Sequence, residues 1–169
     1  GKPHVIRLAV PLEGSTKFHD ELLGDIEWKN EDVNPDPVLL KSDGFPTYHL
    51  ANVIDDHYMK ITHVMRAQEW IPSTPLHVIM YHVFGWEHPA YCHLPMVMGQ
   101  DGQKLSKRHG ATSVGEYRDE GYLPAAVTNY LALLSWSHGD DEVLPLERLE
   151  REFDLDLIAT APSVEYEVL

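Results

Sequence analysis

The stretch richest in reactive side chains is a cationic segment from Gly99 to Gly110, which reads GQDGQKLSKRHG. It gathers two lysines, an arginine, a histidine and a serine, and the glycines at 99 and 102 suit a tight turn. The apolar run over residues 94–98 predicts a buried strand just before it. Open α/β sheets bind ligands at the carboxyl ends of strands, so the segment could grip phosphate. A solvated basic turn explains the same residues, and spacing alone favours that interpretation.

A second group of polar side chains lies on a helix predicted over residues 47–58. Four apolar residues recur at helical spacing and define its expected buried face: Leu50, Val53, Ile54 and Tyr58. Tyr48 and Asn52 are four residues apart, so their side chains are neighbours on another face. A paired phenol and amide could orient a small polar ligand. A partly exposed helix face would carry the same residues, and from spacing alone it is the simpler explanation.

A third group follows a strand predicted over residues 61–67. Arg66 lies near the carboxyl end of that strand, and Glu69 and Trp70 come shortly after it. A guanidinium can bind a carboxylate through two parallel hydrogen bonds, while an indole offers a flat face. A surface ion pair between Arg66 and Glu69 is the alternative explanation.

Hydrophobic periodicity and turn residues predict the elements that position these groups. In the first part of the chain we expect a strand at 5–10, a hairpin over 16–29 and a strand at 38–40. A helix is predicted over 75–84, with Thr74 as its N-cap and Gly85 at its end. Strand, helix and strand over 61–98 then form a βαβ unit with parallel pairing. In the last part we expect one helix from Pro124 and another over about 146–153.

Composition narrows the class of protein. The 169 residues suffice for one domain or two small ones, and 43% of them are hydrophobic. The formal net charge of −14 argues against non-specific nucleic-acid binding by the whole surface, although a local basic site remains compatible with it. One cysteine cannot form an internal disulfide and suits a reducing compartment. With no apolar run of membrane-spanning length and no signal-peptide pattern, we expect a cytoplasmic protein.

Other reactive combinations are weaker. His88, Cys92 and His93 lie close in sequence, but their spacing matches no zinc pattern, so no metal site is assigned. The Asp-Asp-His run at 55–57 cannot share one site, because adjacent helical residues point about 100° apart. Ser106 has no evident base beside it, and the sequence contains no nucleophile elbow, P-loop or dinucleotide fingerprint.

Three ordered stretches resemble the bacterial-type glutamyl-tRNA synthetases, class I enzymes that share the "KMSKS" loop. They read SDGFPTYHLANVIDDHYM at 42–59, THVMRAQEW at 62–70 and KLSKRHG at 104–110. The loop by itself would be a weak signal, whereas the three in this order are specific. Between them, TPLHVIMYHVFGW at 74–86 also fits the family.

The resemblance covers nearly the whole chain and implies an α/β fold with three segments. Residues 1–41 resemble the end of the connective insertion that binds the tRNA acceptor end. Residues 42–110 resemble the second half of the Rossmann-like nucleotide-binding domain, with parallel strands and a crossover helix. Residues 111–169 resemble the helical stem-contact domain.

The resemblance also implies a reaction. Such enzymes join glutamate to ATP as glutamyl-adenylate, release pyrophosphate, and transfer the glutamyl group to the terminal adenosine of tRNA(Glu). The implied glutamate pocket contains Tyr48, Asn52 and Arg66, with Arg66 pairing with a substrate carboxylate. The implied ATP-binding residues are Glu69, Trp70, Lys104, Leu105, Ser106, Lys107 and Arg108. Lys107 is the implied catalytic residue, because it would neutralise charge developing on the pyrophosphate. Mg²⁺ is expected with ATP, and the enzyme is expected to be monomeric.

Two parts of the family's pattern are not in this sequence. The "HIGH" motif with a first substrate-binding arginine, and the anticodon-binding domain, lie outside the matched stretch. The chain is therefore expected to be an internal piece, inactive alone, and its incomplete sheet is expected to leave an apolar edge. Two alternative functions remain open: a glutamyl-queuosine-type tRNA-modifying synthetase, and a non-catalytic RNA-contact module.

Overall fold

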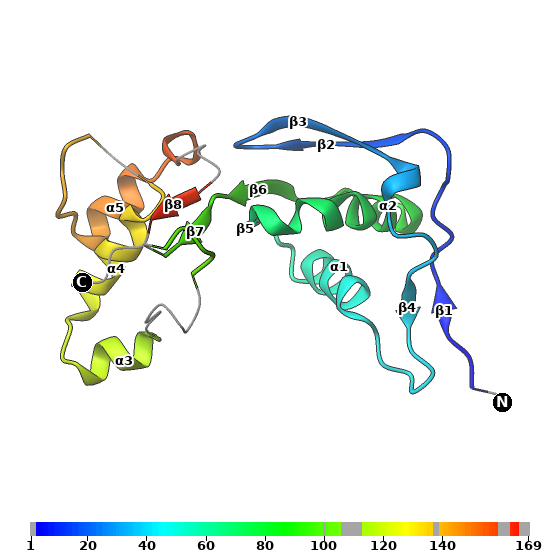
Figure 1. The fold of residues 1–169 in the computed structure, drawn as a ribbon, viewed down its shortest axis with the longest axis horizontal. Coiled ribbons are helices and arrows are strands. Elements are labelled where there is room, and N and C mark those ends of the chain that lie inside the picture. Colours follow the sequence, from blue (N-terminus) through cyan, green and yellow to red (C-terminus); the bar gives the residue numbers. More distant parts are fainter. Residues whose placement is uncertain (1–2, 100, 106–112, 137–138, 159–162, 166–169) are drawn as a thin grey trace. The chain divides into compact units, whose positions relative to one another are not determined.

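The computed structural model describes residues 3–99, 101–105, 113–136, 139–158 and 163–165. They belong to two compact units, residues 1–93 and residues 94–169, which are described separately (Figure 1). The unit boundary after His93 differs from the segment boundaries expected after residues 41 and 110. The physical reason is that the N-terminal hairpin is hydrogen-bonded into the same sheet as later strands. The role expected for each segment remains a prediction.

The first unit is built on a four-stranded mixed sheet in the order β3-β2-β6-β5 (Figure 1). Its strands are β2 (Ser15–Asp20), β3 (Gly24–Lys29), β5 (His63–Ala67) and β6 (Ala90–Leu94). The first two form the predicted hairpin and pair antiparallel, whereas β2 pairs parallel with β6, with Asp20 opposite Tyr91. A separate antiparallel pair joins β1 (Ile6–Arg7) and β4 (Val38–Leu40). The strand predicted over 5–10 is therefore shorter than expected, and that over 38–40 is confirmed.

The predicted helices of this unit are present as α1 (Tyr48–Tyr58) and α2 (Thr74–Phe84). The 3-10 helices are η1 (Asn30–Asp32) and η2 (Gln68–Ser73), and η2 leads from β5 directly into α2. Gly85 ends α2 in the left-handed conformation, at φ 70°, as its position predicted. The prediction for Tyr58 is wrong: it is 72% exposed, because α1 ends there and the ring meets Trp86 edge-on instead of entering the core.

The helix α2 forms the centre of the first unit, because the residues of its first two turns are buried on every side. Leu76 and Met80 pack in one cluster with Val53 of α1 and Leu39 of β4. Val78 faces a second cluster with Phe18 and Tyr91 of the sheet. A helix with hydrophobic residues on most sides favours nearly complete burial, and α2 packs against both α1 and the sheet.

The buried strand predicted over 94–98 is confirmed in part. A strand, β7, is present there, but it is shorter (Met96–Met98) and half-buried. The preceding strand β6 ends at Leu94, and Pro95 separates the two because it has no N–H for a ladder hydrogen bond. In the second unit, β7 pairs parallel with β8 (Ser163–Glu165). Among the described residues of this unit, the helical elements are α3 (Val114–Asp119), α4 (Pro124–Leu133), α5 (Leu146–Glu152) and the 3-10 helix η4 (Leu155–Leu157). The two amphipathic helices expected from the sequence are thus confirmed as α4 and α5.

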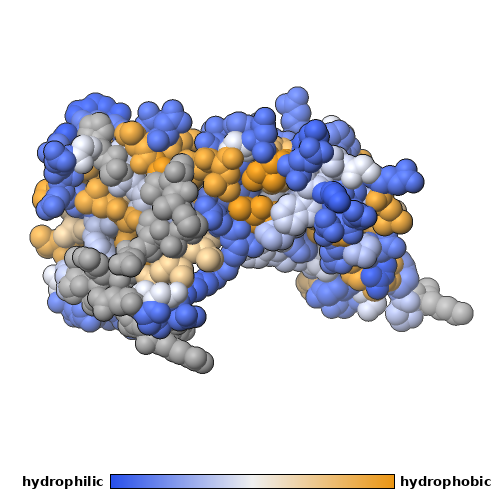
Figure 2. Space-filling model, turned by 45° about the horizontal axis from the view of Figure 1, so that its top comes forward, coloured by the Kyte–Doolittle hydropathy of each residue, from blue (hydrophilic) through white to orange (hydrophobic). Residues whose placement is uncertain are grey.

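The surface mixes polar and apolar side chains, as the face in Figure 2 shows. Exposed apolar residues include Leu123 at 72% and Val143 at 82%. Among the described residues, the longest helices have 11 residues, and none has the length and apolar character needed to cross a membrane.

Candidate functional site

The best-defined polar group in the first unit surrounds Arg66, which β5 carries next to β6. Its guanidinium donates three hydrogen bonds: from Nε to His93 Nε2 at 3.1 Å, from Nη2 to Thr74 Oγ1 at 2.8 Å, and from Nη1 to His77 Nδ1 at 3.4 Å. All three partners are uncharged acceptors in these bonds, since a guanidinium cannot accept. A guanidinium has five N–H groups, and the three described partners use three of them. One N–H group on Nη1 and one on Nη2 can therefore donate to a ligand. None of these three partners is Glu69, which was the alternative partner expected for Arg66.

Two aromatic rings enclose the Arg66 guanidinium. Its central carbon lies 5.9 Å from the centre of the Trp70 ring and 5.5 Å from that of Tyr91. Burial is the main influence on Arg66 and lowers its pKa. A guanidinium is nevertheless always protonated in proteins. The result is a half-buried cation held in one orientation, whose neutral partners leave its charge available to a carboxylate.

Three of the predicted residues meet at this point. Tyr48, at the start of α1, packs against Trp70 with ring centres 5.2 Å apart, and Trp70 lies against Arg66. Tyr48 is 54% exposed, so its ring borders solvent. Asn52 follows one turn later on α1, and its amide donates to Asp56 Oδ2 at 3.2 Å. Glu69 is exposed in η2, one residue before Trp70.

Asp56 is the member of the 55–57 run that belongs to this site. Burial raises the pKa of its carboxyl, while the charge of Arg66 and the hydrogen bond from Asn52 act against that rise. Asp55 is exposed, and His57 stacks on Trp86 with ring centres 3.7 Å apart. Residues 55–57 therefore face three different surroundings, as helical geometry predicts.

The prediction that Thr74 caps α2 is wrong. Ser73 occupies the N-cap position without a side-chain cap bond, and Thr74 is the first helical residue. The Thr74 hydroxyl lies 3.2 Å from the Trp70 carbonyl and accepts from Arg66, so its hydrogen bonds serve the site instead of the helix end.

Sequence reasoning missed the histidines that surround Arg66. His77 is buried in α2, and its Nε2 lies 2.9 Å from Nδ1 of His49 on α1. His93 on β6 is fully buried, and its Nδ1 lies 2.6 Å from Oδ2 of Asp20, which is also fully buried at the end of β2. Ionisable residues within apolar segments are a usable signal, because such groups are rarely buried without a partner.

His93 has a role other than the one suggested by the cluster with Cys92 and His88. The Cys92 thiol is buried, which raises its pKa to about 11, with the nearby Asp20 carboxylate as a lesser cause. His88 lies at the surface, with Nδ1 2.8 Å from the Pro89 carbonyl oxygen. Within the described ranges, no group of three or more His, Cys, Asp or Glu side chains is arranged to hold a metal ion.

The protonation of His77 gives a prediction about stability. Burial, followed by the charge of Arg66, lowers its pKa from 6.5 to about 3. Between these values the unfolded chain binds a proton that the folded chain does not, so stability is lost as the pH falls. We expect His77→Gln to remove this loss, which amounts to up to about 1.4 kcal/mol per pH unit. Denaturant unfolding of the full-length protein between pH 4.5 and 7 measures it.

His82→Gln is the matched control, because His82 is an exposed histidine of the same helix. Its stability curve should run parallel to that of the wild type. A parallel curve for His77→Gln as well would contradict the low pKa.

The cationic segment begins in the second unit. After β7 the chain makes the predicted tight turn: the Gly102 amide donates to the Gly99 carbonyl, and Gly102 has φ 70°. Lys104 then pairs with Met98 across an antiparallel bridge. Lys104 is exposed and Leu105 is half-buried. The remaining predicted residues, Ser106, Lys107 and Arg108, lie outside the described residues.

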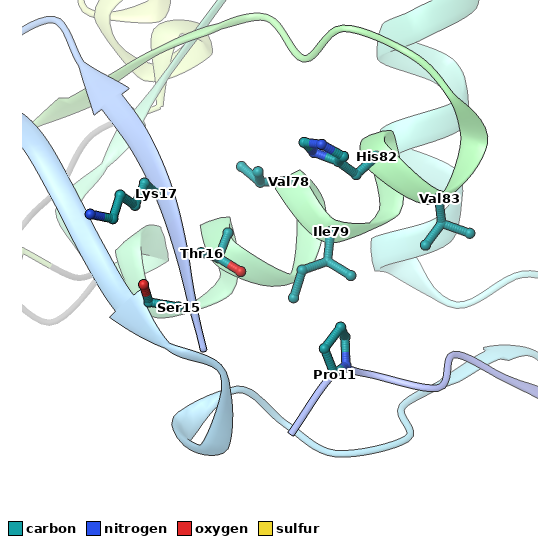
Figure 3. Close-up of a pocket in the computed structure, with 8 residues that line it drawn as sticks. All are labelled: Pro11, Ser15, Thr16, Lys17, Val78, Ile79, His82 and Val83. Carbon is teal, nitrogen blue, oxygen red and sulfur yellow. The ribbon is translucent and has the colours of Figure 1, made fainter. Parts of the chain in front are cut away.

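A pocket of about 400 Å³ is lined by residues of β2 and α2, together with Pro11. Figure 3 shows Val78, Ile79, His82 and Val83 on the helix side and Ser15, Thr16 and Lys17 on the strand side. None of these eight lining residues is a candidate site residue or a partner of Arg66. The candidate site around Arg66 is therefore formed by other residues than those that line this pocket.

The fold and the Arg66 group agree with a family match over almost the entire chain. Residues 1–167 match the model of the class I tRNA synthetases (E and Q), catalytic domain. The chain therefore belongs to this family, and the resemblance stated from the three motifs is confirmed.

Curated relatives and a solved structure narrow the similarity further. The chain is 68% identical over 165 residues to the glutamate–tRNA ligase of Treponema denticola, covering 97% of this chain and 33% of that protein. It is 60% identical to the same ligase of Borrelia duttonii, covering 95% and 32%. A crystal structure of a glutamate–tRNA ligase from Elizabethkingia meningosepticum, in complex with its amino acid, matches with TM-score 0.88 and 39% identity, covering 98% and 36%. The chain thus spans about a third of the length of these relatives.

Proposed function

We propose that the full-length protein containing this chain is a glutamate–tRNA ligase. The observation that carries the proposal is the Arg66 group, in a chain of the class I E and Q family: an oriented cation with two N–H groups left for a carboxylate. A bidentate arginine suits a carboxylate substrate better than a lysine, because its planar fork matches both oxygens.

The proposed reaction has two steps. A carboxylate oxygen of glutamate attacks the α-phosphorus of ATP, and the bond to the bridging oxygen breaks with release of pyrophosphate. A terminal hydroxyl of tRNA(Glu) then attacks the acyl carbon, and AMP leaves. Because the substrates supply both nucleophiles, the protein has to align them and stabilise charge, which fits a site whose described residues include no activated serine or cysteine.

We assign the residues accordingly. Tyr48, Asn52 and Arg66 bind glutamate, with Arg66 facing its side-chain or main-chain carboxylate. Trp70, with Glu69, borders the adenosine of ATP, consistent with the contacts between the rings of Trp70 and Tyr48 and the Arg66 guanidinium. Lys104, Leu105, Ser106, Lys107 and Arg108 bind the phosphates, with Lys107 as the catalytic cation. Mg²⁺ arrives with ATP, held mainly by its phosphates.

The segments have proposed roles in tRNA binding. Residues 1–41 end the insertion that contacts the acceptor end, and residues 111–169 form the stem-contact part, with α4 and α5 as its main helices. β5 is an end strand of the described sheet, and its Met65 is 43% exposed. We propose that further strands of the full-length enzyme cover this edge. The net charge of −14 requires that basic residues gather on the tRNA-facing surface or come from other domains. The enzyme is proposed to be a cytoplasmic monomer.

Aminoacylation by the full-length protein tests this function. With ATP, Mg²⁺ and an unmodified tRNA(Glu) transcript, we expect glutamate to be esterified to the tRNA terminus. Failure to charge unmodified transcript would overturn the proposal. Transfer of glutamate only to a modified base within tRNA would support the tRNA-modifying synthetase, and RNA binding without any glutamyl transfer would support the RNA-contact module.

A further inference from the structure

We propose that Asp20 and His93 are positioning residues for the substrate-binding Arg66: Asp20 fixes the tautomer of His93, and His93 fixes the orientation of the guanidinium. The identity of the substrate rests on the proposed function. The hydrogen bonds that join Asp20, His93 and Arg66 are observed in the first unit. Asp20 lies on the N-terminal hairpin, which the family resemblance had associated with tRNA contacts instead of amino-acid binding.

Asp20 is a fully buried carboxylate with a complete set of donors. Oδ1 accepts from the backbone amides of Leu22 and Leu23, each at 3.1 Å. Oδ2 accepts from the backbone amide of His93 at 3.1 Å and lies 2.6 Å from its ring Nδ1. Burial opposes the charge, but the His93 and backbone hydrogen bonds outweigh it, and the pKa of Asp20 lies below its ordinary value. An ionised carboxylate only accepts, so His93 Nδ1 must carry the proton.

The other ring nitrogen of His93 is then free to accept. His93 Nε2 lies 3.1 Å from Arg66 Nε, which donates to it, and 3.2 Å from the Thr74 hydroxyl. Thr74 also accepts from Arg66 Nη2, so His93 and Thr74 together hold one side of the guanidinium. This side-on grip sets the rotation of Arg66 and thus the direction of its remaining N–H groups.

The opposite tautomer would undo this arrangement. A proton on His93 Nε2 would face the Arg66 Nε–H, placing two donors against each other in a buried site. Arg66 would have to rotate away, and its two ligand-facing N–H groups would turn with it. Orienting a binding group in advance increases affinity by lowering the ordering cost on binding.

The first test is Asp20→Asn in the full-length enzyme. The amide can donate to His93 Nδ1, which favours the Nε2–H tautomer. We expect the KM for glutamate in aminoacylation to rise about tenfold, with the KM for ATP changed less than about twofold, because one well-oriented charged hydrogen bond is lost. Asp25→Asn is the matched control: Asp25 pairs with His19 at 2.7 Å in the same hairpin, but at the surface. It should leave both constants unchanged.

His93→Gln separates positioning from folding. The glutamine side-chain oxygen can accept from Arg66 without any tautomer to control, while Asp20 keeps its hydrogen bonds to the backbone amides. If Asp20 acts through the tautomer, adding Asp20→Asn to His93→Gln should change the glutamate KM less than about twofold. If the glutamate KM of the double variant is about tenfold above that of His93→Gln, Asp20 acts without the His93 tautomer. That result would show a purely structural role for Asp20 and overturn the inference.

Nitrogen-15 NMR of histidine-labelled full-length protein reports the tautomer independently of activity. We expect a protonated Nδ1 for His93, identified by its loss in His93→Gln, and a protonated Nε2 in Asp20→Asn. If His93 carries its proton on Nδ1 but the full-length protein has no glutamate-dependent activity, the proposed function is overturned. The assignment of the tautomer to Asp20 then still stands. An active enzyme whose Asp20→Asn variant keeps the wild-type glutamate KM would overturn the inference alone.

Discussion

Replacing Arg66 with alanine is expected to raise the KM for glutamate about ten- to hundredfold, because a charged hydrogen-bond partner of a carboxylate contributes about 1.5–3 kcal/mol. The described partners of Arg66 are neutral, so its charge is not already committed to a protein carboxylate. The variant should therefore lose affinity for glutamate more than it loses turnover. Steady-state aminoacylation by the full-length enzyme at varied glutamate and saturating ATP measures the effect.

Arg66→Lys sharpens this prediction. Lysine keeps the charge, but it lacks the planar fork that donates to His93 and Thr74 while facing a ligand. We expect a glutamate KM close to that of the alanine variant. Arg7→Ala is the matched control, since Arg7 is exposed and donates to the backbone carbonyl of Asp36. A wild-type glutamate KM in Arg66→Ala, with an unchanged thermal midpoint, would contradict the assignment of Arg66 to the substrate.

Lys107→Ala is expected to slow adenylate formation by about 10²–10³-fold, the range typical for removing one group that stabilises transition-state charge. The reason is chemical: negative charge develops on the departing pyrophosphate, and Lys107 is the cation assigned to it. ATP–pyrophosphate exchange in the presence of glutamate and tRNA measures this step. The KM for glutamate should change little, which separates this variant from Arg66→Ala.

The control for Lys107 is Lys29→Ala, which removes the same charge from an exposed site beside Glu31. An exchange rate in Lys107→Ala equal to that of this control would refute the role given to the loop. Together the arginine and lysine variants divide the proposed reaction into glutamate binding and phosphate chemistry.

Local patterns were sufficient for most elements around the site. The spacing of apolar residues predicted α1 and α2, and the alternation over 16–29 predicted the β2–β3 hairpin, because each of these signals comes from neighbours within one turn or one hairpin. Gly85 and Gly102 were correctly placed at a helix end and a turn, since both need positive φ. Local patterns failed at Thr74, whose hydroxyl accepts a hydrogen bond from Arg66 of another element instead of capping α2.

The order of three motifs by itself determined the family and the candidates Tyr48, Arg66 and Trp70. Only the tertiary structure decided what holds Arg66. His93 lies 27 residues from Arg66 in the chain and 73 from Asp20, and their meeting depends on β2, β5 and β6 sharing one sheet. Sequence spacing carries no information on such pairing, because strand order and register are set by the packing of the whole unit. The cation was therefore visible in the sequence, whereas the buried carboxylate and histidine that orient it appeared only in the fold.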